Sequence, residues 1–309
     1  MSRLGFLKTA LEFQDWFPDE ESCREYLSRC RWPDGFECPR CGGTEGVPLS
    51  TRPLTRCRQC NYQASLTAGT VMQDTRTPLR IWFLGAFLVA THTPGFSAVQ
   101  FQRYTGLKYY KVAFNMLHKL RAAMVRPDRD KIHGIIEADE TYVGGPKEGK
   151  PGRGAEGKVL VAAALEVPSS TERRSRVGRL RLRIVLDASA RSLVGFIKAN
   201  VEVGSAIRTD DWQSYAPLQR AGYRHQVLPS TEMLRIHHIF GNLKTWLRGT
   251  HHGVSQKHLQ AYLNEFVFRY NRRRTPIAAF QTVLGLATHA EGPTYASLSR
   301  TWVHPNPWG

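Results

Sequence analysis

Acidic residues are scarce in this sequence. Its 309 residues include 26 Asp and Glu against 43 Lys and Arg, which gives a formal net charge of +17. We expect a protein with this excess of positive charge to bind polyanions, most simply nucleic acid. An acidic membrane surface is the alternative partner.

Long apolar runs are missing as well. No stretch approaches the roughly 18 apolar residues needed to cross a bilayer, and residues 1–8 lack the apolar centre of a signal peptide. We therefore expect a cytoplasmic protein with no membrane partner. Hydrophobic residues still make up 41% of the chain, which excludes a disordered polypeptide, and the length predicts roughly two domains.

Cysteines are few, and four of the six form two C-x-x-C pairs. Cys38 and Cys41 make the first pair, and Cys57 and Cys60 make the second after a spacer of fifteen residues. Each pair places two thiolates on one tight turn, and two pairs complete a closed tetrahedral site for structural zinc. Four reduced thiols by coincidence is the weaker alternative. The remaining cysteines, residues 23 and 30, fit no ligand spacing and are expected to pack as ordinary thiols.

Three helices are expected after the cysteine-rich region. Apolar residues repeat at helical spacing over 78–92, Ser97 is a plausible N-cap for a helix to about residue 105, and Gly106 makes a turn before a third helix. Lys108 and Lys111 lie at the start of that third helix. The pattern resembles a helix-turn-helix that contacts DNA, although a small helical bundle without DNA contact produces the same pattern.

Beyond about residue 130 the pattern changes to strands mixed with helices. We expect strands at 134–143, 158–167, 179–186 and 205–210, and helices at 192–200, 234–248 and 256–271. Residues 146–157 form a Gly- and Lys-rich loop, which either contacts phosphates or is a plain hairpin connection. In the third strand, the leucines and isoleucine from 180 to 186 are expected to face inward and the arginines at 179, 181 and 183 outward. These elements predict an α/β fold with a mixed sheet flanked by helices.

Three carboxylates interrupt the first of these strands. Because successive side chains of a strand alternate, Glu137 and Asp139 share one face and Glu140 lies on the other. A carboxylate inside an apolar strand is costly unless it is paired, and a divalent cation is one such partner. Asp139 is therefore a candidate metal ligand. Asp210 is a second candidate at a strand end, with a capping role as its alternative; Asp211 is the expected cap for the next segment.

Two later helices carry further candidates. On the helix at 234–248, His237, Lys244 and Arg248 follow one polar stripe beside the apolar face. A histidine there is either a metal ligand or a packed or capping residue. The helix at 256–271 ends at Arg272 and Arg273, which either contact phosphates or stabilise the negative end of the helix dipole.

These motifs together resemble those of bacterial insertion-sequence transposases. The resemblance is to insertion-sequence family fifteen-ninety-five and its ISXO-like branch, and it covers about residues 17–274. It rests on the two C-x-x-C pairs and on the segments RWPDGF (31–36), DETYVGG (139–145), TDDW (209–212), NLKTWL (242–247) and EFVFRYNRR (265–273).

The resemblance implies a zinc ribbon followed by a ribonuclease H-like DDE core. The implied parts are an N-terminal helical segment (1–35), the ribbon (36–77), a helix-turn-helix-like region (78–128), the catalytic domain (129–283) and a C-terminal tail (284–309). The implied activity is transposition: a nucleoid-associated bacterial enzyme binds the terminal inverted repeats, cleaves the ends to free 3′-hydroxyls and joins them to target DNA. Two Mg²⁺ or Mn²⁺ ions are the implied catalytic cofactors, and a homodimer or larger homo-oligomer on DNA is the implied assembly.

The resemblance also implies residue roles. Asp139 and Asp210 correspond to the first two catalytic acids, and Lys244 is expected to hold a phosphate near the cut. The third position, seven residues before Lys244, is His237, where many relatives have Glu or Asn. Magnesium prefers oxygen ligands, whereas imidazole suits manganese or zinc. His237 can bind an ion, orient a water or contact the scissile phosphate, and His238 takes its place if the register is shifted by one.

Two other functions stay open on sequence. A catalytically altered or domesticated relative would act as a metal-dependent nuclease or as a DNA-binding protein, and the histidine at the third position favours it. A zinc-ribbon regulator of transcription without enzymatic activity is the other possibility.

Overall fold

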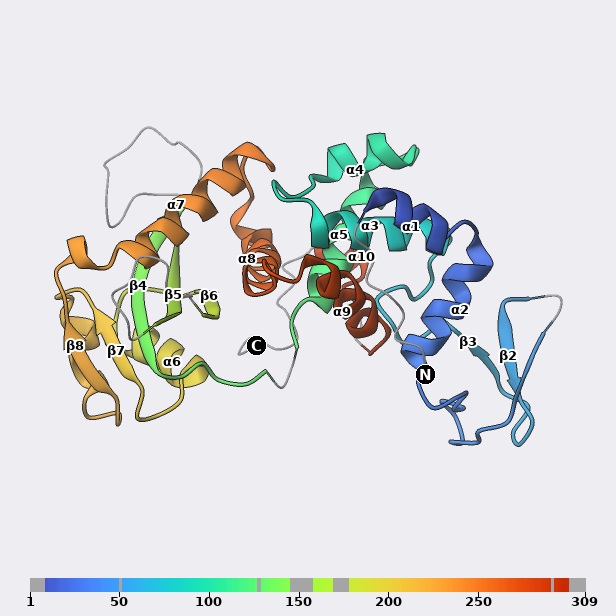
Figure 1. Cartoon of the computed structure of the whole chain (residues 1–309), viewed down its shortest axis with the longest axis horizontal. Helices are drawn as coiled ribbons and strands as arrows, with labels where there is room; N and C mark the ends of the chain where they lie inside the picture. Colours follow the sequence, from blue (N-terminus) through green and yellow to red (C-terminus); the bar gives the residue numbers. More distant parts are fainter. Residues whose placement is uncertain are drawn as a thin grey trace. The chain divides into compact units, whose positions relative to one another are not determined.

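A computed structural model describes residues 9–49, 52–126, 129–144, 158–168, 178–289 and 292–299. The Gly- and Lys-rich loop expected at 146–157 lies outside these residues. The chain divides into two compact units at Val125 and again at Arg273: the first unit combines the N-terminal part with the segment after residue 273, and the second consists of Arg126–Arg273. Figure 1 shows the elements of both. No helix in the described ranges is long and apolar enough to span a bilayer.

The first unit is a helical assembly with a small antiparallel sheet. Its helices are α1 (Ala10–Trp16), α2 (Glu20–Arg31), α3 (Leu79–Thr91), α4 (Ala98–Thr105), α5 (Tyr110–Ala123), α9 (Pro276–His289) and α10 (Tyr295–Ser299). The sheet has the order β1 (Gly46–Pro48), β2 (Leu54–Cys57), β3 (Gln63–Ser65). Arg31, in the last turn of α2, donates hydrogen bonds to the carbonyls of Ser65, Leu66 and Ala68 and so ties that helix to the end of β3 and the segment after it.

The expected pair of helices around Gly106 is present. Ser97 caps α4 in a reciprocal capping box with Gln100, and Gly106 ends this helix with a φ of +68°. This left-handed conformation suits glycine and reverses the chain into α5. The two helices expected on either side of Gly106 are therefore confirmed, and the role of the region 78–128 as a helix-turn-helix that contacts DNA stays a prediction.

Helix α9 packs in the first unit, whereas we expected residues up to 283 to belong to the catalytic domain. Phe280 of this helix is fully buried, and its ring lies 6.0 Å from that of Phe17 and 5.9 Å from that of Phe87 (between centroids). Phe13 and Phe83 complete the aromatic core. The observed division thus falls at Arg273, because burial of this aromatic cluster requires a helix from the C-terminal part of the chain.

The second unit is built on a five-stranded mixed sheet. The strands are β4 (Ile135–Val143), β5 (Val159–Val167), β6 (Leu180–Ile184), β7 (Ala206–Thr209) and β8 (Arg224–Val227). Their spatial order is β6-β5-β4-β7-β8; β5 is antiparallel to β4 and β6, and β7 runs parallel to β4 and β8. Strand β8 was not expected, because three of its four residues are exposed and show no apolar alternation.

Helices cover both faces of this sheet (Figure 1). Apolar side chains of α7 (Leu234–Gly249) and α8 (Gln256–Asn271) pack on one face, and those of α6 (Ala190–Asn200) and of the short 3-10 helix η1 (Gln213–Leu218) pack on the other. A second short 3-10 helix, η2 (Ser230–Glu232), precedes α7. The sheet is therefore a central layer between helices, and its three parallel strands β4, β7 and β8 run in the same direction.

Strand β6 differs from the expected inward and outward alternation. Arg181 is buried, because its guanidinium donates hydrogen bonds to the carbonyls of Asp130, at 2.8 Å, and Leu180, at 3.1 Å. Leu186 is 93% exposed, because the strand ends at Ile184 and the alternation does not extend beyond it. The expectations of an exposed Arg181 and a buried Leu186 were wrong.

Candidate functional site

Asp139 lies in the middle of β4, and Asp210 directly follows the end of the adjacent parallel strand β7. Strands β4 and β7 pair in a register that sets Glu137 opposite Arg208. Two residues further along both strands, this register brings Asp139 level with Asp210, which directly follows β7. The two acids that the sequence singled out are therefore neighbours at one edge of the sheet.

His237 contacts the first of these acids. Its Nε2 lies 3.1 Å from Oδ2 of Asp139, whose side chain is 13% exposed. His237 is in the first turn of α7, on the side that covers β4, whereas the next residue, His238, is exposed. The structure therefore favours His237 over His238 as the third member of the site.

Glu137 ties the start of helix α7 to strand β4. Its buried carboxylate accepts a hydrogen bond from the backbone N–H of Ile236 at 3.0 Å. The residue at the N-cap position of this helix, Met233, provides no side-chain cap, so the strand provides an acceptor for one of the free amides. Burial raises the pKa of Glu137, against this hydrogen bond and the nearby Arg235 and Arg208. Glu137 thus holds the turn of the helix that carries His237.

The pKa of the Asp139 carboxyl group is raised by its surroundings. Burial raises its pKa, and the nearby Asp210 raises it further, while the Glu140 amide and His237 act in the opposite direction. In the described part of the chain, the four zinc-ribbon cysteines are the one group of three or more His, Cys, Asp or Glu residues whose ligand atoms all lie within 4.8 Å. Hence no oxygen of Asp210 lies that close to both Asp139 and His237, although the two acids interact.

The side chain of Asp210, rather than that of Asp211 as expected, accepts the backbone hydrogen bond at the turn after β7. Oδ1 of Asp210 accepts a hydrogen bond from the backbone N–H of Trp212 at 3.2 Å. Asp211 is exposed, and η1 receives no side-chain cap at its N-cap residue, Trp212. The expected cap at Asp211 was wrong, because the acid one position earlier already accepts the amide at this turn.

Lys244 brings positive charge toward the same edge. It lies two turns along α7 from His237 and is half-buried. Its pKa is lowered by burial and by the cations Arg248 and Lys158, while Asp139 acts in the opposite direction. Sequence reasoning missed Lys158. Its position just before a strand that pairs with the end of β4 could have identified it.

The other candidate DNA contacts lie elsewhere in the two units. Lys108 and Lys111 are exposed at the start of α5, and Nζ of Lys108 lies 5.2 Å from the ring centroid of Tyr109. At the end of α8, the guanidinium of Arg272 stacks 4.1 Å from the ring of Phe268, and that of Arg273 lies 4.0 Å from the ring of Tyr270. These two arginines therefore have a packing role.

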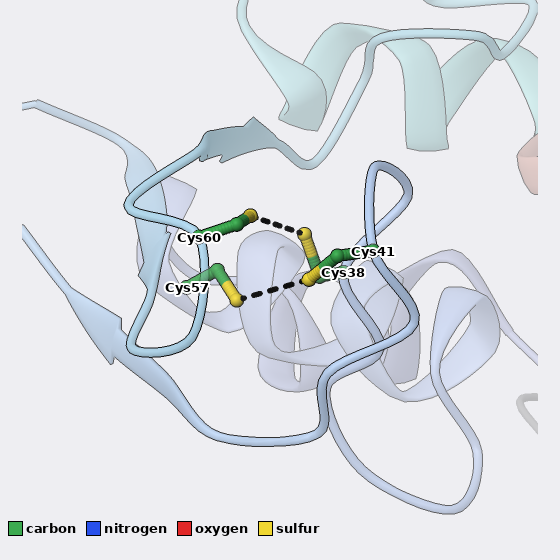
Figure 2. A group of neighbouring side chains, drawn as sticks. All are labelled: Cys38, Cys41, Cys57 and Cys60. Atoms are coloured by element: carbon green, nitrogen blue, oxygen red, sulfur yellow. Dashed lines mark hydrogen bonds between the residues drawn. The ribbon is translucent and has the colours of Figure 1, made fainter.

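The four cysteines of the C-x-x-C pairs converge (Figure 2). Sγ of Cys38 lies 3.6 Å from that of Cys60, and Sγ of Cys41 lies 3.7 Å from that of Cys57. Zinc–sulfur bonds of about 2.3 Å in a tetrahedron place sulfurs about 3.8 Å apart, so these positions fit a structural zinc ion. Cys23 and Cys30 lie outside the group, as expected for ordinary thiols.

Comparison with known proteins identifies two modules. The ISXO2-like transposase domain matches residues 131–271, and the transposase zinc-ribbon domain matches residues 18–63. A protein described as uncharacterized in transposable element ISH50 of Halobacterium salinarum is 24% identical over 308 residues, covering 88% of this chain and 98% of that protein. No solved structure matches the chain.

The comparisons agree with the observed architecture. The catalytic-domain match spans the mixed sheet with helices on both faces, which is a ribonuclease H-like fold, and the ribbon match spans all four converging cysteines. Both matched domains are transposase domains of the same family of elements. The chain therefore carries both the zinc ribbon and the ISXO2-like DDE domain of insertion-sequence transposase family fifteen-ninety-five.

Proposed function

We propose that this protein is a DNA transposase that cleaves the ends of an insertion sequence and joins the freed 3′-hydroxyls to target DNA. The observation that carries this proposal is the contact of Asp139, on β4, with His237, level with Asp210 just after the neighbouring strand β7. In this proposal one site performs both steps. Water attacks the phosphodiester at the element end, and the resulting 3′-hydroxyl then attacks a phosphodiester of the target.

The acids at this edge fit divalent cations. Asp139 and Asp210 repel each other, and burial adds to the cost of charging Asp139, so a bound cation would relieve both effects. Carboxylate oxygens suit Mg²⁺ and Mn²⁺, and the imidazole of His237 suits Mn²⁺ better than Mg²⁺. Two bound ions would activate the attacking oxygen and stabilise the leaving oxygen in an in-line displacement.

The remaining residues of the site have roles that follow from their positions. Asp139 and Asp210 would hold the ions, and His237 would complete the site or orient the attacking water. Lys244 would bind a phosphate oxygen beside the scissile bond, with Arg248 and Lys158 adding positive charge next to it. Glu137 would keep His237 in place through the start of α7.

DNA recognition is assigned to surfaces outside this edge. Lys108 and Lys111 at the start of α5, together with the zinc ribbon, would contact the terminal inverted repeats, and Arg272 and Arg273 would supply phosphate contacts in the second unit. Joining two element ends to one target requires at least two active sites, so we propose a homodimer or larger homo-oligomer on DNA. Binding to chromosomal DNA would place the protein in the nucleoid.

A strand-transfer assay with end oligonucleotides tests this function. With Mg²⁺ or Mn²⁺ we expect joined products from the wild type and none from Asp210→Asn. His237 at the third position favours one alternative, a metal-dependent nuclease or a catalytically altered relative, which predicts nicking without joining or no reaction. A zinc-ribbon regulator predicts that Asp210→Asn leaves every measurable activity unchanged.

A further inference from the structure

Glu140 has a partner on the opposite face of the sheet from Asp139. The hydroxyl of Tyr215 donates a hydrogen bond to Oε2 of Glu140 at 2.9 Å. Tyr215 is 2% exposed and packs among the apolar residues that cover this face. It belongs to η1, the helix that begins three residues after Asp210. The bond therefore joins the strand of the first acid to the segment that follows the second.

Backbone hydrogen bonds link both sides of the Tyr215–Glu140 pair to the two acids. The backbone N–H of Glu140 donates to Oδ1 of Asp139 at 2.7 Å, and the backbone N–H of Trp212 donates to Oδ1 of Asp210 at 3.2 Å. The indole of Trp212 also donates to the carbonyl of Ala188 at 2.9 Å, which anchors the turn before η1. The backbone pairing between β4 and β7 does not extend to Asp210, because β7 ends at Thr209. The Tyr215–Glu140 hydrogen bond therefore links the segment after Asp210 to the strand that carries Asp139.

The tyrosine is suited to a constant donor role. Burial and the neighbouring Glu140 raise the pKa of Tyr215 well above its ordinary value. The phenol therefore stays protonated at neutral and moderately alkaline pH.

We propose that Tyr215 and Glu140 form a positioning pair that sets the spacing of Asp139 and Asp210 and thereby the affinity of the site for divalent cations. Neither residue is assigned contact with the DNA or with the reacting atoms. The inference rests on the proposed function only in treating the two acids as metal ligands. Partners outside the ligand shell commonly change metal affinity by about 10–100-fold when they are removed.

The test compares Tyr215→Phe with a matched tyrosine variant. The hydroxyl of Tyr223 is in the same apolar cluster, is also buried and donates to the carbonyl of Val201 at 3.2 Å, but it is not connected to either acid. We expect Tyr215→Phe to weaken Mn²⁺ binding about tenfold, measured on the full-length protein without DNA by electron paramagnetic resonance. Tyr223→Phe should bind Mn²⁺ like the wild type. Equal Mn²⁺ affinity in the two variants would overturn the proposal.

Variants of Glu140 separate the hydrogen bond from the charge. Glu140→Gln keeps an acceptor for Tyr215 and should bind Mn²⁺ within about twofold of the wild type, whereas Glu140→Leu should reproduce the loss seen in Tyr215→Phe. A large loss in Glu140→Gln with a normal Tyr215→Phe would show that Glu140 is itself a ligand and would overturn the pair. Strand joining is measured separately: if the wild type binds Mn²⁺ through Asp139 without joining DNA, the proposed function fails while the effect of the pair on affinity is still measured.

Discussion

Nε2 of His237 lies 3.1 Å from Oδ2 of Asp139, so helix α7 places an imidazole against the central acid of strand β4. A third carboxylate at this position would add negative charge beside Asp139, whose pKa is already raised by burial and by Asp210. The imidazole avoids that repulsion, and as a nitrogen ligand in the proposed site it would favour Mn²⁺ over Mg²⁺.

This contact predicts a change in metal preference. His237→Ala should lower metal-dependent strand joining by about tenfold or more at limiting Mn²⁺, because the variant lacks the imidazole that is proposed to complete the metal site. His237→Glu should stay active and shift the preference toward Mg²⁺, since it supplies oxygen ligands. Titrating both metals in the joining assay measures the shift. His238→Ala, on the exposed neighbouring residue, is the control, and a larger loss there than in His237→Ala would contradict the assignment.

The zinc ribbon should be a separate folding element that depends on metal. Cys57→Ser removes a fully buried ligand, and structural zinc contributes about 10–16 kcal/mol in zinc-finger peptides, so the ribbon should unfold. We expect the zinc content to fall from one ion per chain to near zero, with a loss of binding to the element end. Cys30→Ser lies outside the ligand group and should keep its zinc. Full zinc content in Cys57→Ser would contradict the four-cysteine site.

The start of α5 should contribute phosphate contacts. Replacing Lys108 and Lys111 together by alanine should weaken binding to the element end and reduce the slope of log affinity against log salt by about 1.8, or about 0.9 for each lost phosphate contact. Fluorescence anisotropy over a range of salt concentrations measures this slope. Lys198→Ala removes an exposed charge from α6 and should leave the slope unchanged. An unchanged slope in the double variant would assign these lysines to the solvated surface.

An ion pair at the start of β6 should make stability depend on acidic pH. Burial alone would raise the pKa of Glu166, but hydrogen bonds from the side chain and backbone of Arg179 and from the His133 amide lower it overall. A carboxyl group whose pKa is lower in the folded than in the unfolded chain, where it is 4.5, stabilises the fold at pH values above 4.5. This stabilisation is lost as the pH falls through the pKa of the folded state.

Glu166→Gln should therefore destabilise the protein by about 1–2 kcal/mol at pH 7, with a difference that shrinks below pH 4.5, as measured by chemical denaturation at several pH values. We expect a loss of stability this small because Arg179 is partly exposed and solvent weakens its interaction with Glu166. Glu25→Gln, on an exposed site of α2, should show no such pH dependence. A constant difference between Glu166→Gln and wild type from pH 7 to pH 4 would exclude the ion pair as the cause.

Most of the features that were predicted correctly from the sequence belong to strong local patterns. The C-x-x-C spacing identified all four cysteines that converge, and strand alternation correctly separated Asp139 from Glu140, which bonds to Tyr215 on the other face. The helical periodicity of α3, α7 and α8 was sufficient to place these elements within about two residues.

Long-range relationships could not be predicted in this way. Glu137 accepts from an amide 99 positions later, and Glu140 pairs with a tyrosine 75 positions later, so no local spacing reveals either contact. The apolar face of α9 shows that the helix is buried but not which unit it packs against. Strand β8 is short and mostly exposed, and its ladder depends on pairing with β7 rather than on its own composition.

Strand joining by Asp139→Asn, compared with wild type, tests the central claim most directly. With end and target oligonucleotides and Mg²⁺ or Mn²⁺, the wild type should produce joined DNA, and Asp139→Asn should lose at least about a hundredfold of this activity while it still binds the element end. The neighbouring exposed acid offers a control in Asp211→Asn, which should retain activity. Full strand joining by Asp139→Asn would contradict the proposed metal-dependent mechanism.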